Sequence, residues 1–234
     1  MKISICIPMY NEITTAADTS EALTREMEAF CAESGDTYEI IFSDDGSKDG
    51  CIDAVRGDLT LDHGEIVKVK SDVNMGKGAA VRRAALASTG DIVMYTDCDL
   101  AYGTAIIPEA VKYMRENGFD LLAGSRAIHP EGYEGYTFIR KLTSKTYLAV
   151  LTLFAGFKLF EGKLARRIFS LAETNGWAFD FELFMLANRE AARIGDFPVK
   201  VVNHRESRIS VLRDSIKMLR ELRRIKKRVA SLDK

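Results

Sequence analysis

The chain has 234 residues, enough to bury one substantial hydrophobic core, and its 47% of hydrophobic residues with only four prolines exclude a disordered or fibrous protein. The formal net charge of −1 is unevenly spread, because residues 211–234 hold nine Lys or Arg and only three Asp or Glu. The rest of the chain is therefore acidic. Because the basic segment also lacks interleaved aromatic residues, nucleic acid is not an expected partner.

Short apolar runs alternate with segments of helical periodicity through the first half of the chain. The pattern predicts strands at 3–7, 39–43, 66–69, 92–96 and 121–123. It predicts helices at 15–33, 78–88 and 106–116. This alternation is typical of βαβ units, so we expect an α/β fold with a doubly wound, mainly parallel sheet.

The alternation stops after Arg126. An amphipathic stretch is predicted at 138–160, a helix at 180–193 and a strand at 197–202. No low-complexity linker separates these elements from the first half. We therefore expect a single domain over residues 1–208.

A basic amphipathic helix is predicted to follow that domain, over residues 209–234. From Ile209 onward, apolar residues recur every three or four positions, with basic residues largely between them. Three partners are open for its apolar stripe: an anionic membrane surface, the chain's own domain, or a second copy in a coiled-coil dimer.

The spacing of the cysteines and the lengths of the apolar runs indicate in which cellular compartment the protein works. The four cysteines show no Cys-x-x-Cys spacing, and we expect buried, reduced thiols in a cytoplasmic protein: Cys6, Cys31, Cys51 and Cys98. The apolar run at 3–7 is too short for a signal peptide. The longest apolar stretch, 147–157, has about half the length that a membrane-spanning helix needs. No segment is expected to cross a bilayer.

Asp97 and Asp99 follow the predicted strand at 92–96 directly. Open α/β sheets bind ligands at the carboxyl ends of their strands. Two hard oxygen ligands at that position suit Mg²⁺ or Mn²⁺ on a diphosphate. An acidic pair in isolation is more often a solvated turn, so the metal interpretation depends on the other polar loops of the same edge.

Two of those loops follow the first and second predicted strands, at residues 8–12 and 44–50. Tyr10 could stack on a base, and Glu12 and Asp45 could accept hydrogen bonds from a base or a ribose. The alternative is structural, because Asp and Ser side chains in such loops commonly cap helices and form turns.

A third loop, residues 74–78, opens a predicted helix and carries Lys77. Backbone N–H groups, the positive end of the helix dipole and one lysine together favour an anion. The spacing is not that of a Walker loop. No Gly-x-Gly-x-x-Gly follows the first strand, which disfavours a dinucleotide-dependent dehydrogenase.

Five motifs in order carry a resemblance: Pro-x-Tyr-Asn-Glu at 8–12, Asp-Asp-Gly-Ser-x-Asp-Gly at 44–50, Asn-x-Gly-Lys-Gly-x-Ala-Val-Arg at 74–82, Asp-x-Asp at 97–99 and Gly-Ser-Arg at 124–126. They resemble the inverting glycosyltransferases of family 2, and among these the polyprenyl-phosphate sugar synthases, which include the dolichyl-phosphate glucosyltransferases and dolichol-phosphate mannose synthases. Segments 156–160, 166–169 and 176–183 resemble the glucosyl branch, so the resemblance covers nearly the whole chain.

The resemblance implies a GT-A type α/β fold with C-terminal amphipathic helices, a donor half at about 1–126 and an acceptor half at about 127–208. It implies inverting transfer of a hexose from a nucleotide sugar, with UDP-glucose favoured over GDP-mannose, to a polyprenyl or dolichyl phosphate at the cytoplasmic face of a membrane. A saccharide or other soluble acceptor, or nucleotide-sugar binding without catalysis, are the alternatives.

The same resemblance implies residue roles. The nucleotide-sugar donor would be bound by Pro8, Tyr10, Glu12, Asp45 and Lys77. Asp97 and Asp99 would hold Mg²⁺ or Mn²⁺. Phosphate groups of the donor or acceptor would be bound by Arg126, Arg140 and Ser144, with Arg205 and Arg208 near the acceptor. Ala101 leaves the third metal ligand open, because many mannose synthases carry Gln or Ser shortly after the second aspartate.

Two acidic residues of the predicted helix at 180–193 have two open interpretations. A hydroxyl acceptor would need a general base, for which Asp180 and Glu182 are candidates, whereas a lipid phosphate is already an anion. Alternatively, one of the two caps the helix and the other pairs on the surface with Arg189 or Arg193. The neighbouring Trp177 is predicted to lie in the core.

Overall fold

The computed structural model describes residues 1–126, 128–130, 156–202 and 211–232, with only the helical backbone described over 211–220. One sheet of seven strands runs through the described residues, in the order β3-β2-β1-β4-β6-β5-β7. Its strands are β1 (Lys2–Met9), β2 (Thr37–Asp45), β3 (Gly64–Ser71), β4 (Ile92–Thr96), β5 (Leu121–Ser125), β6 (Phe157–Glu161) and β7 (Ile194–Pro198).

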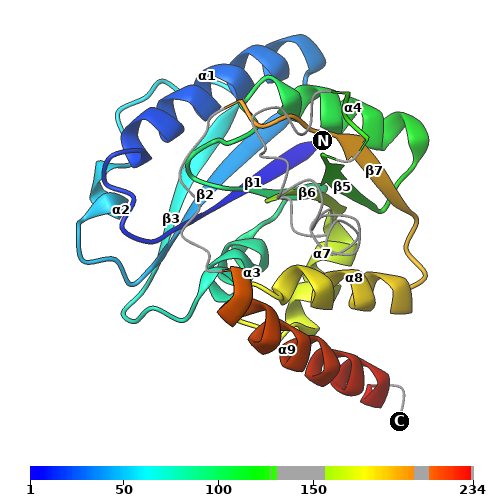
Figure 1. Ribbon diagram of the computed structural model, residues 1–234. Helices are drawn as coiled ribbons and strands as arrows, with labels where there is room; N and C mark the ends of the chain where they lie inside the picture. The colour runs from blue at the N-terminus through cyan, green and yellow to red at the C-terminus, as the bar shows by residue number, and fades with distance from the viewer. Residues whose placement is uncertain (127, 131–155, 203–210, 233–234) are drawn as a thin grey trace.

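Helices cover both faces of this sheet (Figure 1). On one face lie α1 (Ala16–Ser34), α2 (Cys51–Ala54) and α4 (Ile106–Asn117). On the other lie α3 (Lys77–Ala87), α7 (Gly162–Leu171) and α8 (Phe179–Arg189), with α9 (Val211–Ser231) packed outside them. The predicted doubly wound α/β fold is confirmed.

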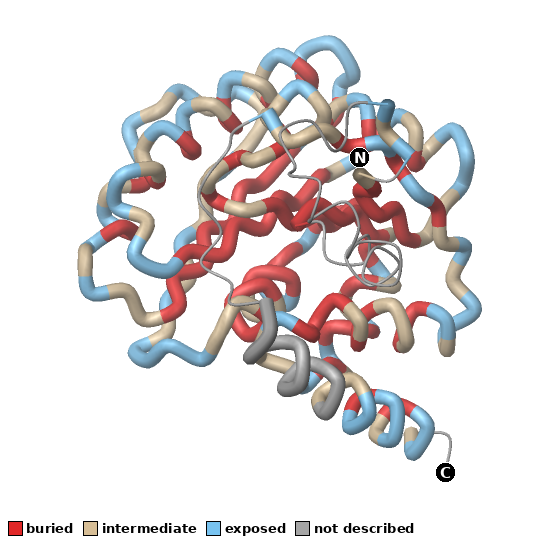
Figure 2. Tube along the Cα trace, in the orientation of Figure 1, coloured by how far each residue is buried: buried red, intermediate tan, exposed pale blue. Residues whose placement is uncertain are grey.

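The inner strands of the sheet are buried on both sides, as Figure 2 shows, whereas the edge strand β3 is only partly covered. Alternate residues of one strand serve the two cores, since successive side chains of a strand point to opposite faces. In β1, Ile5 and Ile7 pack towards α1 and α4, while Cys6 packs towards α3 and α7. All four cysteines are buried free thiols, as predicted.

Strands β1 to β4 are mutually parallel, so their carboxyl ends meet at one edge of the sheet. The five strands and three helices predicted before Arg126 are all present, with boundaries within two residues of those expected. The loops predicted to carry the chemistry therefore share an edge. No helix among the described residues is long and apolar enough to cross a membrane.

The second half contains one strand that was not predicted from the sequence. Residues 157–161 form β6, which is antiparallel to both β4 and β5, whereas the amphipathic stretch was predicted to continue to Phe160. Lys158 interrupts the apolar pattern, although in the structure it is fully buried and paired with Asp180. The helix α7 was not predicted, and the strand predicted at 197–202 is instead Ile194–Pro198.

The described part of the C-terminal helix packs on its own domain. Ile225 and Val229 belong to the core between α3, α7 and α8, and Leu222 and Leu232 pack against that core. Of the three partners left open for the apolar stripe, its own domain is therefore the one found over residues 221–232. The stripe in this part of α9 is not available to a membrane or a second copy.

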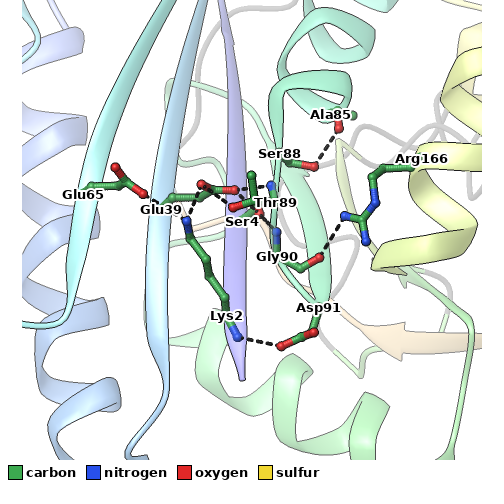
Figure 3. A network of polar contacts seen from close by, with 10 residues as sticks. All are labelled: Lys2, Ser4, Glu39, Glu65, Ala85, Ser88, Thr89, Gly90, Asp91 and Arg166. Carbon is green, nitrogen blue, oxygen red and sulfur yellow. Dashed lines mark hydrogen bonds and ion pairs between the residues drawn. The ribbon is translucent and has the colours of Figure 1, made fainter.

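A polar network at the opposite, amino edge of the sheet centres on the buried Glu39 (Figure 3). Its carboxylate pairs with Lys2 at 2.8 Å and accepts hydrogen bonds from Ser4 Oγ and from the backbone N–H and hydroxyl of Thr89. Burial disfavours the charged form, but these partners outweigh it and hold the pKa of Glu39 below its usual value.

Replacing Glu39 by Gln is expected to destabilise the fold by about 2 kcal/mol at neutral pH, because charge-assisted hydrogen bonds are lost. Since the pKa of Glu39 is lowered by folding, its contribution is present above the unfolded pKa and is lost as pH falls through the folded value. Urea unfolding should therefore show a difference between wild type and E39Q that shrinks in acid. E65Q, which removes an exposed partner of Lys2, should cost less than about 1 kcal/mol; equal losses would contradict the role of burial.

Candidate functional site

The two aspartates after β4 lie in a compact turn. The backbone carbonyl of Asp97 accepts from the N–H of Leu100, and Asp99 Oδ1 accepts from the N–H of Ala101 at 3.1 Å. Leu100 has a φ of 47°, in the left-handed region that side chains disfavour, and its conformation is fixed by this turn. The predicted turn is therefore present. The hydrogen bonds that form it use the Asp97 backbone carbonyl and the Asp99 side chain, so they do not involve the Asp97 carboxylate.

Lys77 forms an ion pair with Asp97, with its Nζ 2.5 Å from Asp97 Oδ1. Lys77 is the first residue of α3, so a cationic side chain and a helix amino terminus lie together at the end of β4. Burial works against the charge of Lys77, but Asp97 outweighs it and holds the pKa of Lys77 above its usual value. The third loop and the Asp-x-Asp turn therefore converge, as predicted.

Gly156 forms one wall of this site. A Cβ built on Gly156 would overlap the carboxylate of Asp97, with its Cγ only 2.9 Å away. Only the absence of a side chain at Gly156 leaves space for the carboxylate where it stands. The sequence contains Gly156 in the segment that resembles the glucosyl branch, but nothing in its local pattern pointed to Asp97.

Asp45 is buried and holds the loop at residues 74–77. Its Oδ2 accepts from the N–H groups of Met75 at 3.0 Å and Gly76 at 2.6 Å, and its Oδ1 pairs with Arg83 at 3.3 Å. Both oxygens are thus engaged with the protein. These contacts position the loop that carries Lys77, and direct hydrogen bonding of Asp45 to the donor stays a prediction.

The residues after β1 surround the same edge. Pro8 is buried within the strand, and Tyr10 is exposed, with 42% of its surface accessible. Glu12 accepts from the hydroxyl of Thr15 at 3.0 Å, at the start of α1. Asp44 accepts from the N–H of Ser47, which is the turn-forming contact expected of that loop. Tyr10 is accessible from solvent, and its stacking on a base stays a prediction.

Arg126 contacts Tyr102, which follows the Asp-x-Asp turn. Its Nη2 donates to the Tyr102 hydroxyl at 2.8 Å, and the guanidinium lies 5.5 Å from the ring centre. Burial raises the pKa of Tyr102, and Arg126 opposes this shift. The arginine is thereby connected to the aspartate turn. The predicted residues Arg140, Ser144, Arg205 and Arg208 lie outside the described residues.

Asp180 is buried beneath this site, which differs from both interpretations offered for it. Its carboxylate pairs with Lys158 at 3.2 Å and accepts from the Tyr95 hydroxyl. Burial lowers the pKa of Lys158 and raises the pKa of Asp180, since it disfavours both charges. Asp180 is neither a helix cap with a free oxygen nor an exposed base.

Glu182 is also fully buried, and it pairs with Arg228 of α9. The predicted surface pairs with Arg189 or Arg193 are wrong for Glu182, because the side chain points into the interface between α8 and α9. The prediction failed because α9 lies far along the chain, and no local pattern shows which residue it covers.

Trp177 was predicted to lie in the core, and this is wrong: 60% of its surface is exposed. Its ring centre lies 5.1 Å from Lys77 Nζ, within the range of a cation–π contact. It is the one tryptophan of the chain.

Asp97 and Asp99 fit a hard divalent cation by donor type. Asp97 already holds a positive charge, that of Lys77, which shows that the position favours a cation. Among the described residues, no group of three or more His, Cys, Asp or Glu side chains forms a fuller cluster. Any remaining coordination positions would then fall to the nucleotide or to water.

Comparison with sequence families identifies one match. The family described as Glycosyl transferase family 2 matches residues 4–193. Glycosyltransferase AglD of Haloferax volcanii is 28% identical over an alignment 227 positions long, which covers 93% of this chain and 36% of that protein. Dolichyl-phosphate beta-glucosyltransferase ALG5C of Trichomonas vaginalis is 30% identical over an alignment 210 positions long, which covers 83% of this chain and 62% of that protein. The chain thus spans about a third to two thirds of the length of these two relatives.

Longer coverage is found with the dolichyl-phosphate beta-glucosyltransferase of Saccharomyces cerevisiae, which is 27% identical over an alignment 245 positions long, gaps included, that covers 94% of this chain and 72% of that protein. Among solved structures, glucosyl-3-phosphoglycerate synthase from Mycobacterium tuberculosis, in complex with Mn²⁺, uridine diphosphate and glucosyl-3-phosphoglycerate, has a TM-score of 0.65 and 20% identity, covering 98% of this chain and 80% of that one.

Mannosyltransferase PcManGT from Pyrobaculum calidifontis, in complex with GDP-Man and Mn²⁺, has a TM-score of 0.59 and 18% identity, covering 84% of this chain and 54% of that one. At these identities the structural likeness shows the fold alone. The fold is of the GT-A type, as the resemblance implied.

Proposed function

The chain belongs to glycosyl transferase family 2, and from this premise we propose that it transfers a hexose from a nucleotide sugar to a polyprenyl phosphate, with inversion at the anomeric carbon. The observation that carries the proposal is the ion pair of Lys77 with Asp97 at the carboxyl end of β4. It brings an anion-binding helix terminus and a pair of metal-type ligands to one point, which is what a nucleoside diphosphate needs.

The donor would lie along the loops that follow β1, β2 and β3. Tyr10 offers an exposed ring for the base, and Glu12 lies beside it. Asp45 contributes through the loop that it fixes, which presents Lys77 to the diphosphate. UDP-glucose is the favoured sugar donor, because three of the relatives are named dolichyl-phosphate beta-glucosyltransferases.

The leaving group is the chemical problem of this reaction, since negative charge builds on the diphosphate as the bond to the sugar breaks. A divalent cation, when bound, would neutralise part of that charge. Asp97 and Asp99 would hold that cation on the diphosphate, as proposed above. Lys77 would supply a second positive charge from the amino end of α3, and Arg126, beside Tyr102, would bind a phosphate group.

A lipid phosphate is the acceptor that the described residues favour. A hydroxyl acceptor needs a base that it can reach, and both candidates are buried: Asp180 against Lys158 and Tyr95, Glu182 against Arg228. A phosphate acceptor is already an anion at neutral pH and needs no base. Its phosphate would be bound by Arg140, Ser144, Arg205 and Arg208, together with Arg126.

A purified chain incubated with UDP-glucose or GDP-mannose, Mn²⁺ or Mg²⁺ and a polyprenyl phosphate in vesicles is expected to yield a lipid-linked sugar, detected by mass spectrometry. The anomeric configuration of the product, read by NMR, should be the inverse of the donor's. Transfer to a saccharide and not to the lipid would support the soluble-acceptor alternative. Donor binding with at most slow hydrolysis would support a non-catalytic binding protein.

The outward face of α9 fits the cytoplasmic surface of a membrane. Over residues 221–232 the apolar residues pack against the domain, and the exposed cations of this part of the helix are Arg223, Arg224, Lys226 and Lys227. Each such charge near anionic lipid contributes about 1 kcal/mol. Replacing all four by Gln is expected to abolish sedimentation with vesicles that contain anionic lipid, at unchanged thermal stability. Equal sedimentation of wild type and variant would contradict docking through this face.

A further inference from the structure

An unbroken series of polar contacts joins the C-terminal helix to Lys77. We propose that α9 is a positioning element of the donor site: Arg228, acting through Glu182, fixes the segment at residues 172–177, and this bridging segment supports the loop that carries Lys77. The role of Lys77 in binding the donor rests on the proposed function. The coupling itself is a property of the described contacts.

The first step is a buried ion pair between two helices. Glu182 of α8 is fully buried, and its Oε1 pairs with the guanidinium of Arg228, which is 19% exposed. The same guanidinium also pairs with Glu173 of the bridging segment, at 3.3 Å. Arg228 therefore contacts the segment directly as well as through Glu182.

The second step is the other oxygen of Glu182. Oε2 accepts from the backbone N–H groups of Glu173 at 3.0 Å and Thr174 at 2.7 Å. A carboxylate that accepts two adjacent N–H groups fixes the direction of that backbone. Removing Arg228 would leave the buried charge of Glu182 uncompensated, so its side chain would turn or protonate and release these contacts.

The third step runs from the bridging segment to the start of α3. The carbonyl of Asn175 accepts from the N–H of Gly78 at 2.8 Å, and Arg82 donates to the carbonyl of Ala172 at 2.9 Å and to Asn175 Oδ1 at 3.0 Å. A Cβ built on Gly76 would lie 2.5 Å from the Asn175 carbonyl oxygen. The two backbones are thus in direct contact, and a shift of one must move the other.

The last step ends at the lysine. Lys77 lies between Gly76 and Gly78, and the ring of Trp177, at the end of the bridging segment, covers its Nζ. Asp45 holds the opposite side of the same loop. The lysine is therefore fixed from two sides, and one of the two depends on α9.

A role in stability alone does not account for this arrangement. The apolar residues Ile225 and Val229 dock the helix by burial in the core, whereas a buried ion pair typically contributes little net stability compared with an apolar pair. The ion pair of Glu182 with Arg228 fixes the orientation of the Glu182 carboxylate. Because that carboxylate holds the bridging segment, its orientation affects the position of Lys77.

Three variants test the coupling without reference to catalysis: R228M, R228K and the matched control R224M, which removes an exposed arginine four residues earlier on the same helix. In R228M, hydrogen exchange at the amides of Thr174 and Gly78 should be about 10-fold faster or more. Fluorescence of Trp177, the single tryptophan, should be quenched more readily by acrylamide. R228K should restore both in part, and R224M should match wild type.

The affinity for UDP with Mn²⁺ is a second readout, with an expected loss of about 10-fold in R228M. If UDP does not bind the wild type, the proposed function fails while exchange and fluorescence still decide the coupling. Should R228M not fold, the double variant E182M/R228M, which removes both charges and also the oxygen that accepts from the bridging segment, serves in its place. Exchange and quenching equal to those of R224M in a folded R228M or double variant would overturn the proposal.

Discussion

Replacing Asp97 by Asn is expected to lower hexosyl transfer by about 10²- to 10³-fold, because it removes the charge that pairs with Lys77 and that would hold the proposed divalent cation. Asn has nearly the same shape, so the fold should be retained. Measured with saturating donor, the loss should fall on kcat, and Mn²⁺ affinity followed by electron paramagnetic resonance should weaken as well. D91N is a matched control, since Asp91 precedes the same strand at the opposite edge of the sheet.

The need for the Asp97 carboxylate in its observed position can be tested without removing its charge. G156A should displace the Asp97 carboxylate, because the added Cβ would occupy its place. We expect weaker Mn²⁺ binding and a loss of transfer close to that of D97N. The control is G57A, where a Cβ meets nothing within 4 Å. Transfer by G156A at the level of G57A would show that the position of Asp97 does not matter.

Replacing Lys158 by Met is expected to destabilise the protein by about 3 to 5 kcal/mol, because Asp180 is left as an uncompensated buried charge. The double variant K158M/D180N should recover much of that loss, since it removes both charges and keeps an acceptor for the Tyr95 hydroxyl. Urea unfolding measures both effects. K163M, on the exposed side of α7, should change stability by about 0.5 kcal/mol at most.

The outcome also bears on the acceptor. If the double variant folds and still transfers the hexose, Asp180 is not a general base, and an acceptor that is already ionised is favoured. A K158M variant as stable as K163M would contradict the view that Lys158 and Asp180 neutralise each other in the core.

The first half of the fold could be predicted because its signals are local. Strands β1 to β4 are apolar runs, each followed by polar residues, and parallel strands bring those loops to one edge. The convergence of Lys77 and Asp97 followed from that rule alone. The direction in which Asp45 points did not, because it depends on a loop 30 residues away.

The second half could not be predicted in the same way, since its charged residues are partnered across long distances. The strand β6 was not predicted because a lysine normally ends an apolar strand, whereas Lys158 is buried here in an ion pair with Asp180. Glu182 was expected at the surface for the same reason, with its partner Arg228 46 residues further along. Pairing of this kind is a property of the assembled fold and is absent from any local window of sequence.

The antiparallel strand β6 has a consequence for how turnover can proceed. It is hydrogen-bonded to β4, which leads to Asp97, and to β5, which leads to Arg126, so the two halves share a single sheet. A hinge between rigid lobes, of the kind by which many transferases close on their substrates, would have to break this ladder. Any closure that accompanies the proposed transfer must therefore leave β4, β5 and β6 together as one unit.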